Sequence, residues 1–219
     1  MSEQVRLFVG PTAHGVDVPV PAGVALLPPV RRGDVQRIVD EEQPGVLAVA
    51  DGTFHSYPSV AHAELRHALE AGWQVWGLCS MGAIRAAEMR HLGMRGYGRV
   101  YEMYATDPEF DDDEVALLHA GEAPHRPLSE PLVHIRFFLD GLVGRNLLDA
   151  EGRAAVVTEL KHRWYAERTL PGLAAALTKA GLNEELVAAE LADFSPYRLK
   201  ALDLVEFVKE QPWCTPSPR

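Results

Sequence analysis

Cysteine is scarce in this chain of 219 residues. Only Cys79 and Cys214 are present, so no disulfide framework is expected, and a chain of this length can bury a sizeable core without one. No apolar run approaches the roughly 20 residues that cross a bilayer, and residues 1–20 lack the basic and apolar regions of a secretory signal. We therefore expect a protein of the reducing cytoplasm that has no membrane partner.

Basic residues are also outnumbered. The chain has 21 Lys and Arg against 31 Asp and Glu, a formal net charge of -10. Affinity for nucleic acid depends on neutralising phosphates with basic side chains, so this balance argues against a nucleic-acid partner.

Metal and phosphate motifs are missing too. No Cys/His spacing matches a zinc site, and no Walker sequence occurs. The acidic run 107–114 lacks the spacing of a Ca²⁺ loop, and we interpret it as a solvated helix start. The glycines of the segment 93–98 are not expected to be followed by the helix that a phosphate-binding loop requires. We predict neither a metal nor a cofactor.

What the first half contains is an alternation of short apolar runs and helical patterns. Runs rich in branched residues predict strands at 5–9, 24–27, 46–50 and 74–78. Helical patterns follow Asp34, Ser59 and Ser80. This order predicts an α/β fold with a mainly parallel, Rossmann-like sheet and flanking helices.

The second half shows helical spacing alone from Ser129 onward, including a last helix with Leu199, Leu202 and Val205. We therefore expect an α/β core domain of residues 1–125, followed by an all-helical C-terminal extension of residues 126–219.

Four turns directly follow the predicted strands: Gly10-Pro11-Thr12, Pro28-Pro29, Asp51-Gly52 and Cys79-Ser80. In open parallel sheets, ligands bind outside the carboxyl ends of the strands. These turns should converge on one edge of the sheet, which is where we expect the functional site.

Ser80 is the first candidate on this edge. The segment Leu78-Cys-Ser-Met-Gly82 joins a strand to a helix and has part of a nucleophile elbow, but it lacks the glycine two residues before the serine. Ser80 could be a nucleophile served by helix-end N–H groups, or a simple helix N-cap, which the spacing alone favours. Cys79 is a rival nucleophile because a helix N-terminus lowers a thiol pKa, although small buried cysteines are common at strand ends.

Other candidates are less specific. Asp51 could be a carboxylate partner or part of an ordinary Asp-Gly turn. Either His55 or His62 could be a base, although a lone histidine is more often structural. Arg85 and Glu88, three residues apart on one helix, could pair with each other or face the edge of the sheet.

The order of these motifs resembles that of one family, the TfuA-like proteins. The resemblance covers about residues 5–140, with a weaker echo at 198–204, and the Ser80-Met-Gly-Ala block is its most specific part. Thr12 stands where the family usually has serine, Ile84 where it has leucine, and Cys79 where a small residue is usual. The matching segments are Val9-Gly-Pro-Thr12, Pro28 to Asp34, Asp51-Gly-Thr-Phe54, the helix with His62 and Glu64, Ser80 to Glu88, Gly93 to Gly98 and Asp112 to Val115.

The resemblance implies a role beside a YcaO-type enzyme that forms backbone thioamides on a ribosomally made precursor peptide or a protein. The YcaO-type enzyme activates the amide with ATP, and the TfuA-like partner delivers sulfur by hydrolysing a thiocarboxylated sulfur-carrier protein. The alternative is a non-catalytic adaptor that docks the YcaO-type enzyme to its sulfur donor, using the aromatic residues Phe137, Phe138 and Trp164. A serine hydrolase of small esters is a third interpretation, which the incomplete elbow disfavours.

The same resemblance, joined to the chemistry of acyl transfer, suggests roles for the candidates. Ser80 would be the nucleophile or position the oxyanion, with Asp51 and His55 as base or orienting groups. Arg85 and Arg32 would hold the carboxylate end of the substrate. The other predicted substrate-binding residues are Thr12, Cys79, Glu88 and His62.

Overall fold

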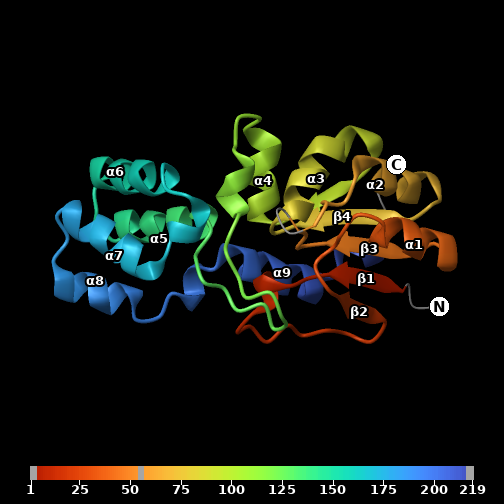
Figure 1. Ribbon diagram of the computed structural model, residues 1–219, viewed down its shortest axis with the longest axis horizontal. Helices are drawn as coiled ribbons and strands as arrows, with labels where there is room; N and C mark the ends of the chain where they lie inside the picture. Colours follow the sequence, from red (N-terminus) through yellow and green to blue (C-terminus); the bar gives the residue numbers. More distant parts are fainter. Residues whose placement is uncertain (1–3, 54–56, 216–219) are drawn as a thin grey trace. The chain divides into compact units, whose positions relative to one another are not determined.

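The computed structural model describes residues 4–53 and 57–215, so the predicted base His55 lies outside the described residues. The chain forms two compact units, labelled by element in Figure 1. Unit 1 contains the described parts of Met1–Phe110 and Lys200–Arg219, and unit 2 is Asp111–Leu199. The last helix therefore belongs with the α/β part of the chain. The expected division at residue 125 stays a prediction about domains.

Unit 1 is built on a five-stranded, all-parallel sheet with the order β2-β1-β3-β4-β5. The predicted α/β class with a parallel sheet is thus confirmed. Four strands fall on the predicted apolar runs, whereas β5 was not predicted because its Arg-Gly-Tyr sequence has no apolar pattern and it pairs only with β4. The strands are β1 (Val5–Phe8), β2 (Val24–Leu27), β3 (Val46–Val49), β4 (Gln74–Leu78) and β5 (Arg95–Tyr97).

Helices cover both faces of this sheet, because successive side chains of β3 pack alternately into two different apolar cores. Leu47 and Val49 pack in a core with residues of the first three helices, whereas Val46 and Ala48 pack with residues of the last helix. Figure 1 shows this last helix in blue beside the red strands β1 and β2. The helices of unit 1 are α1 (Asp34–Glu41), α2 (His62–Glu70), α3 (Met81–Met89), α4 (Arg99–Thr106) and α9 (Leu199–Glu210).

The glycine-rich segment is followed by a helix after all, since α4 begins directly after Gly98. The prediction that no helix follows it was wrong. A side chain of the protein itself already binds the N-terminus of α4, because the Val100 N–H donates to Asp203 Oδ2 at 2.9 Å. A carboxylate from α9 thus takes the place that a phosphate would have at a helix N-terminus.

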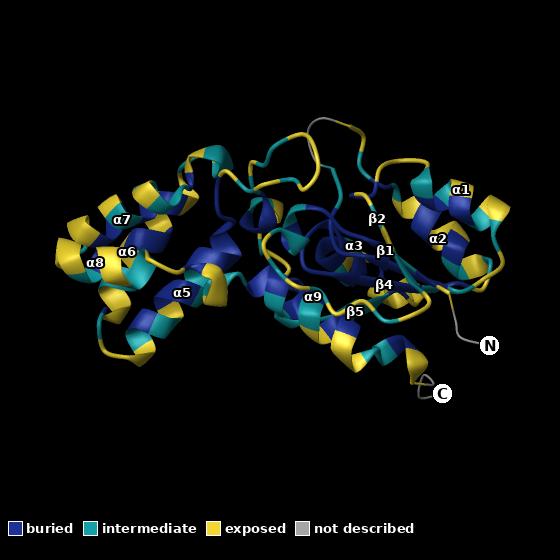
Figure 2. Cartoon of the chain, turned by 90° about the horizontal axis from the view of Figure 1, so that it is seen from below, coloured by how far each residue is buried: buried dark blue, intermediate teal, exposed yellow. Residues whose placement is uncertain are grey.

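Unit 2 forms a series of helices after Ser129, as the spacing there predicts. Its helices are α5 (Leu132–Gly144), α6 (Ala150–Lys161), α7 (Leu170–Lys179) and α8 (Glu184–Leu191). Each helix buries one face in a shared apolar core, and Figure 2 shows buried and exposed stretches alternating along them. Side-chain caps begin three of the helices: Asp149 for α6, Thr169 for α7 and Asn183 for α8.

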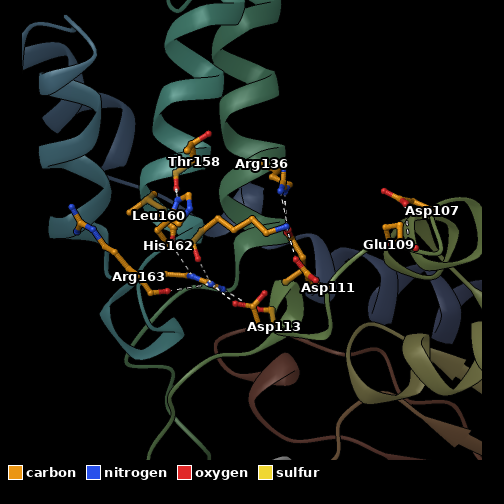
Figure 3. A network of polar contacts seen from close by, with 12 residues as sticks. Asp107, Glu109, Asp111, Asp113, Arg136, Thr158, Leu160, His162 and Arg163 are labelled. Carbon is orange, nitrogen blue, oxygen red and sulfur yellow. Dashed lines mark hydrogen bonds and ion pairs between the residues drawn. The ribbon is translucent and has the colours of Figure 1, made fainter.

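The acidic run is only in part a solvated helix start. Asp107, Glu109, Asp111 and Asp112 are exposed, and a short helix begins at Asp112, but Glu114 is buried, which corrects our interpretation for that residue. Asp112–Val115 forms a short 3-10 helix in which Glu114 is fully buried and receives two hydrogen bonds from Arg136, at 2.9 and 2.8 Å. The buried Arg168 donates to the Asp113 carbonyl and to the Leu160 carbonyl, at 2.9 and 3.1 Å. Asp113 and Leu160 are labelled in Figure 3. These arginines neutralise the acids and tie the run to α5 and to the end of α6.

Candidate functional site

Asp51 lies where the strand order of the sheet reverses, between β1 and β3. The order 2-1-3-4-5 places the switch point at the carboxyl ends of these two strands, which is where ligands bind in such folds. Asp51 is 2% exposed. Its Oδ2 accepts the N–H groups of Gly10 and Thr12, at 2.8 and 3.0 Å, and its Oδ1 accepts the Thr12 hydroxyl at 2.6 Å. The structure thus brings the predicted Asp51 and Thr12 together, and Asp51 fixes the loop after β1.

The turn between β4 and α3 is strained at Cys79. Its φ is +62°, and the Ser80 N–H donates to the Leu78 carbonyl at 2.7 Å, which closes a tight γ-turn. The Cys79 side chain is fully buried, and its Sγ donates to the Lys200 carbonyl at 3.2 Å. Burial, and then the charges of Asp203 and Asp51, raise the pKa of the Cys79 thiol well above its ordinary value. A protonated thiol in this position argues against Cys79 as the nucleophile.

Ser80 occupies the N-cap position of α3, but its side chain makes no capping hydrogen bond. The N-cap interpretation therefore holds for the position and not for the hydroxyl. Two glycines allow this turn to pack against the sheet: a Cβ on Gly82 would overlap the Val49 carbonyl, and a Cβ on Gly77 would overlap the Gly82 carbonyl. Ser80 is consequently held on rigid elements at the carboxyl end of β4.

Lys200 of α9 also lies at this edge of the sheet, and the sequence reasoning missed it. It is 1% exposed, and its Nζ lies 3.9 Å from Asp51 Oδ1. Lys200 shares one helix face with the buried Leu204, Phe207 and Val208. A lysine on an apolar helix face is the signal that could have identified it, because lysine is almost never fully buried without a partner.

The remaining predicted residues form a separate network. Glu88 Oε2 accepts Arg85 Nη1 at 2.6 Å and lies 2.8 Å from His62 Nε2. Arg85 and Glu88 thus pair with each other, one of the two alternatives left open. Arg32 Nε donates instead to the Ser59 carbonyl at 3.3 Å. Within the part of the chain that the structure describes, no hydrogen bond joins this network to Ser80.

Over residues 4–53 and 57–215, no group of three or more His, Cys, Asp or Glu residues is arranged to hold a metal ion. Within the same residues, no helix has the length and apolar character needed to cross a membrane.

The fold and this edge of the sheet define an α/β protein with a serine at a strand–helix turn beside a buried Asp–Lys pair. A sequence profile of the TfuA-like protein family matches residues 51–169, more than half of the chain. The chain therefore belongs to the TfuA-like family, which is associated with thioamide formation. No curated protein matches the sequence.

The matched range begins and ends later than the resemblance over residues 5–140 suggested. It includes Asp51 and Ser80, whereas Thr12, Arg32 and Lys200 lie outside it.

Proposed function

We propose that this protein supplies sulfur for thioamide formation by hydrolysing the C-terminal thiocarboxylate of a sulfur-carrier protein, beside a YcaO-type enzyme and its precursor peptide. The observation that carries this proposal is the position of Ser80. Its hydroxyl is not used as a helix cap. Ser80 directly follows the strained residue Cys79 at the end of β4, and Asp51, which Thr12 holds by a hydrogen bond, follows the neighbouring strand β3. Strain and uncommitted polar groups collect at functional sites.

The reaction needs a nucleophile and a place for negative charge. Ser80 Oγ would form a bond to the acyl carbon, the C–S bond would break, and the serine proton would leave with the sulfur as hydrosulfide. Water would then cleave the ester, which returns the serine and leaves an ordinary carboxylate on the carrier. The N–H groups of Gly82 and Ala83 already donate to the carbonyls of Ala50 and Ser80. The Met81 N–H, on the same turn as Ser80, is the donor that suits the oxyanion of each step.

Asp51 suits an orienting role better than that of a base. Three donors from Gly10 and Thr12 use most of its acceptor capacity, and Lys200 Nζ lies 3.9 Å from the remaining side of Oδ1. A base needs a free lone pair within reach of the proton that it accepts. Asp51 would then hold the loop after β1 in place beside Ser80.

The non-catalytic adaptor remains a second candidate because of one residue in unit 2. Trp164 is 61% exposed, whereas Phe138 is fully buried in the helical core. Exposed tryptophan is typical of the centre of binding surfaces. In this alternative, Trp164→Ala would weaken binding to the YcaO-type enzyme, and the exposed Leu92→Ala would not.

One assay separates the two functions. The purified protein is incubated with the thiocarboxylated carrier without the YcaO-type enzyme, and sulfide is measured over time. Hydrolysis predicts sulfide release together with conversion of the carrier to its carboxylate form by mass spectrometry. If sulfide release matches the rate without protein, and the protein binds both partners, the hydrolase proposal is wrong and the adaptor is correct.

A further inference from the structure

Lys200 is a buried cation that contacts the ends of two neighbouring strands. Its Nζ lies 3.9 Å from Oδ1 of Asp51, just beyond β3. Its backbone carbonyl accepts the thiol of Cys79, just beyond β4, at 3.2 Å. The residue that follows Cys79 is Ser80. Lys200 therefore bridges the switch point of the sheet and the turn that carries the proposed nucleophile.

Lys200 is a charged residue on an otherwise apolar helix face. Leu204, Phe207 and Val208, on the same face of α9, are all buried, so the burial of this face does not by itself require a charge at position 200. The Lys200 ammonium and the Asp51 carboxylate form a buried ion pair 3.9 Å apart, which holds a positive charge at the switch point of the sheet.

We infer that the Lys200 ammonium selects an anionic acyl group as the substrate at this site. The inference rests on the proposed hydrolysis and adds the residue that makes the site specific for a thiocarboxylate. A thiocarboxylate carries a negative charge that a thioester lacks. A cation in a buried site attracts such a charge far more strongly than one in water.

The charges in the reaction support this assignment. When Ser80 Oγ adds to an anionic acyl group, negative charge gathers on the former carbonyl oxygen and on the sulfur. The C–S bond then breaks, the sulfur leaves as hydrosulfide with the serine proton, and an uncharged ester remains. A fixed ammonium would stabilise the charged intermediate more than the ester that follows it.

The test compares two substrates in matched variants. Sulfur release is measured from the thiocarboxylated carrier and thiol release from the same carrier as an uncharged C-terminal methyl thioester. For Lys200→Met we expect kcat/KM for the thiocarboxylate to fall at least roughly tenfold more than kcat/KM for the thioester. Lys200→Arg should keep most of the preference, and the exposed Lys209→Met on the same helix should keep all of it. Equal losses for both substrates in Lys200→Met would show a merely structural role and overturn the inference.

A binding measurement on the unmodified protein does not depend on whether any variant folds. The carrier with an ordinary C-terminal carboxylate should bind roughly tenfold or more tightly than the carrier with a C-terminal amide. Equal affinities would overturn the inference even if the protein releases sulfide. Conversely, tighter binding of the carboxylate without any sulfide release would contradict the proposed hydrolysis and leave the anion preference standing.

Discussion

Replacing Asp51 with asparagine should destabilise unit 1 through the loss of one charge. The amide oxygen of Asn can still accept the Gly10 and Thr12 N–H groups that now reach Oδ2, and the Thr12 hydroxyl can turn to accept from the amide nitrogen. The negative charge 3.9 Å from Lys200 cannot be recovered. Removing one partner of a buried pair costs about 3–5 kcal/mol, so we expect the free energy of unfolding to fall by that amount.

The assay is urea unfolding followed by tryptophan fluorescence, because Trp73, Trp76 and Trp213 are all buried in unit 1. Asp40→Asn is the matched control, since exposed Asp40 accepts one hydrogen bond from Gln36, and it should change stability by less than about 0.5 kcal/mol. Adding Lys200→Met to Asp51→Asn should restore at least about 1 kcal/mol relative to the sum of the single changes. A loss below about 1 kcal/mol for Asp51→Asn, or strict additivity in the double variant, would refute this reasoning.

Three further predictions concern the frame around the site. Gly82→Ala should prevent folding of unit 1 because its Cβ would overlap the Val49 carbonyl, whereas Gly144→Ala, in open space, should be neutral; circular dichroism of both variants checks this. Burial alone would raise the pKa of Glu130, but the hydrogen bonds and charges of His134 and Arg198 outweigh it and lower that pKa below its ordinary 4.5. The ionised Glu130 therefore contributes stability that is complete above pH 4.5 and is lost as the pH falls through the lowered pKa. In urea unfolding at a series of pH values, the free energy of unfolding of Glu130→Gln should therefore fall less steeply below pH 4.5 than that of the unmodified protein. Arg168→Met should cost about 3–5 kcal/mol and speed hydrogen exchange at the end of α6; unchanged exchange there would contradict the bracing role of Arg168.

Much of the α/β frame was predictable because its strands are short runs of branched apolar residues between turn signals. The strand β5 escaped prediction, since Arg95, Gly96 and Tyr97 carry no apolar pattern and gain their place only by pairing with β4. The burial of Glu114 was also hidden, because Arg136, its bonding partner, lies on a helix further along the chain. Tertiary pairing of this kind leaves no local signal.

Four turns at strand ends predict which edge of the sheet carries the candidate site, but not all the residues that gather there. Of the predicted residues, Asp51 and Thr12 do meet at this edge. The positive φ of Cys79 could not be foreseen, because a residue other than glycine seldom adopts it. Lys200 was missed because the sequence pattern of α9 is like that of the other helices in the second half. Only the structure shows that this part of the chain belongs to unit 1, with the sheet.

The central claim is that Ser80 cleaves a thiocarboxylate, and single-turnover sulfide release tests it most directly. Unmodified protein in excess over the thiocarboxylated carrier should release sulfide in full. Ser80→Ala should slow that release by at least about a thousandfold, with an unchanged unfolding curve because the hydroxyl makes no capping bond. Release by Ser80→Ala at the rate of the unmodified protein would contradict the claim.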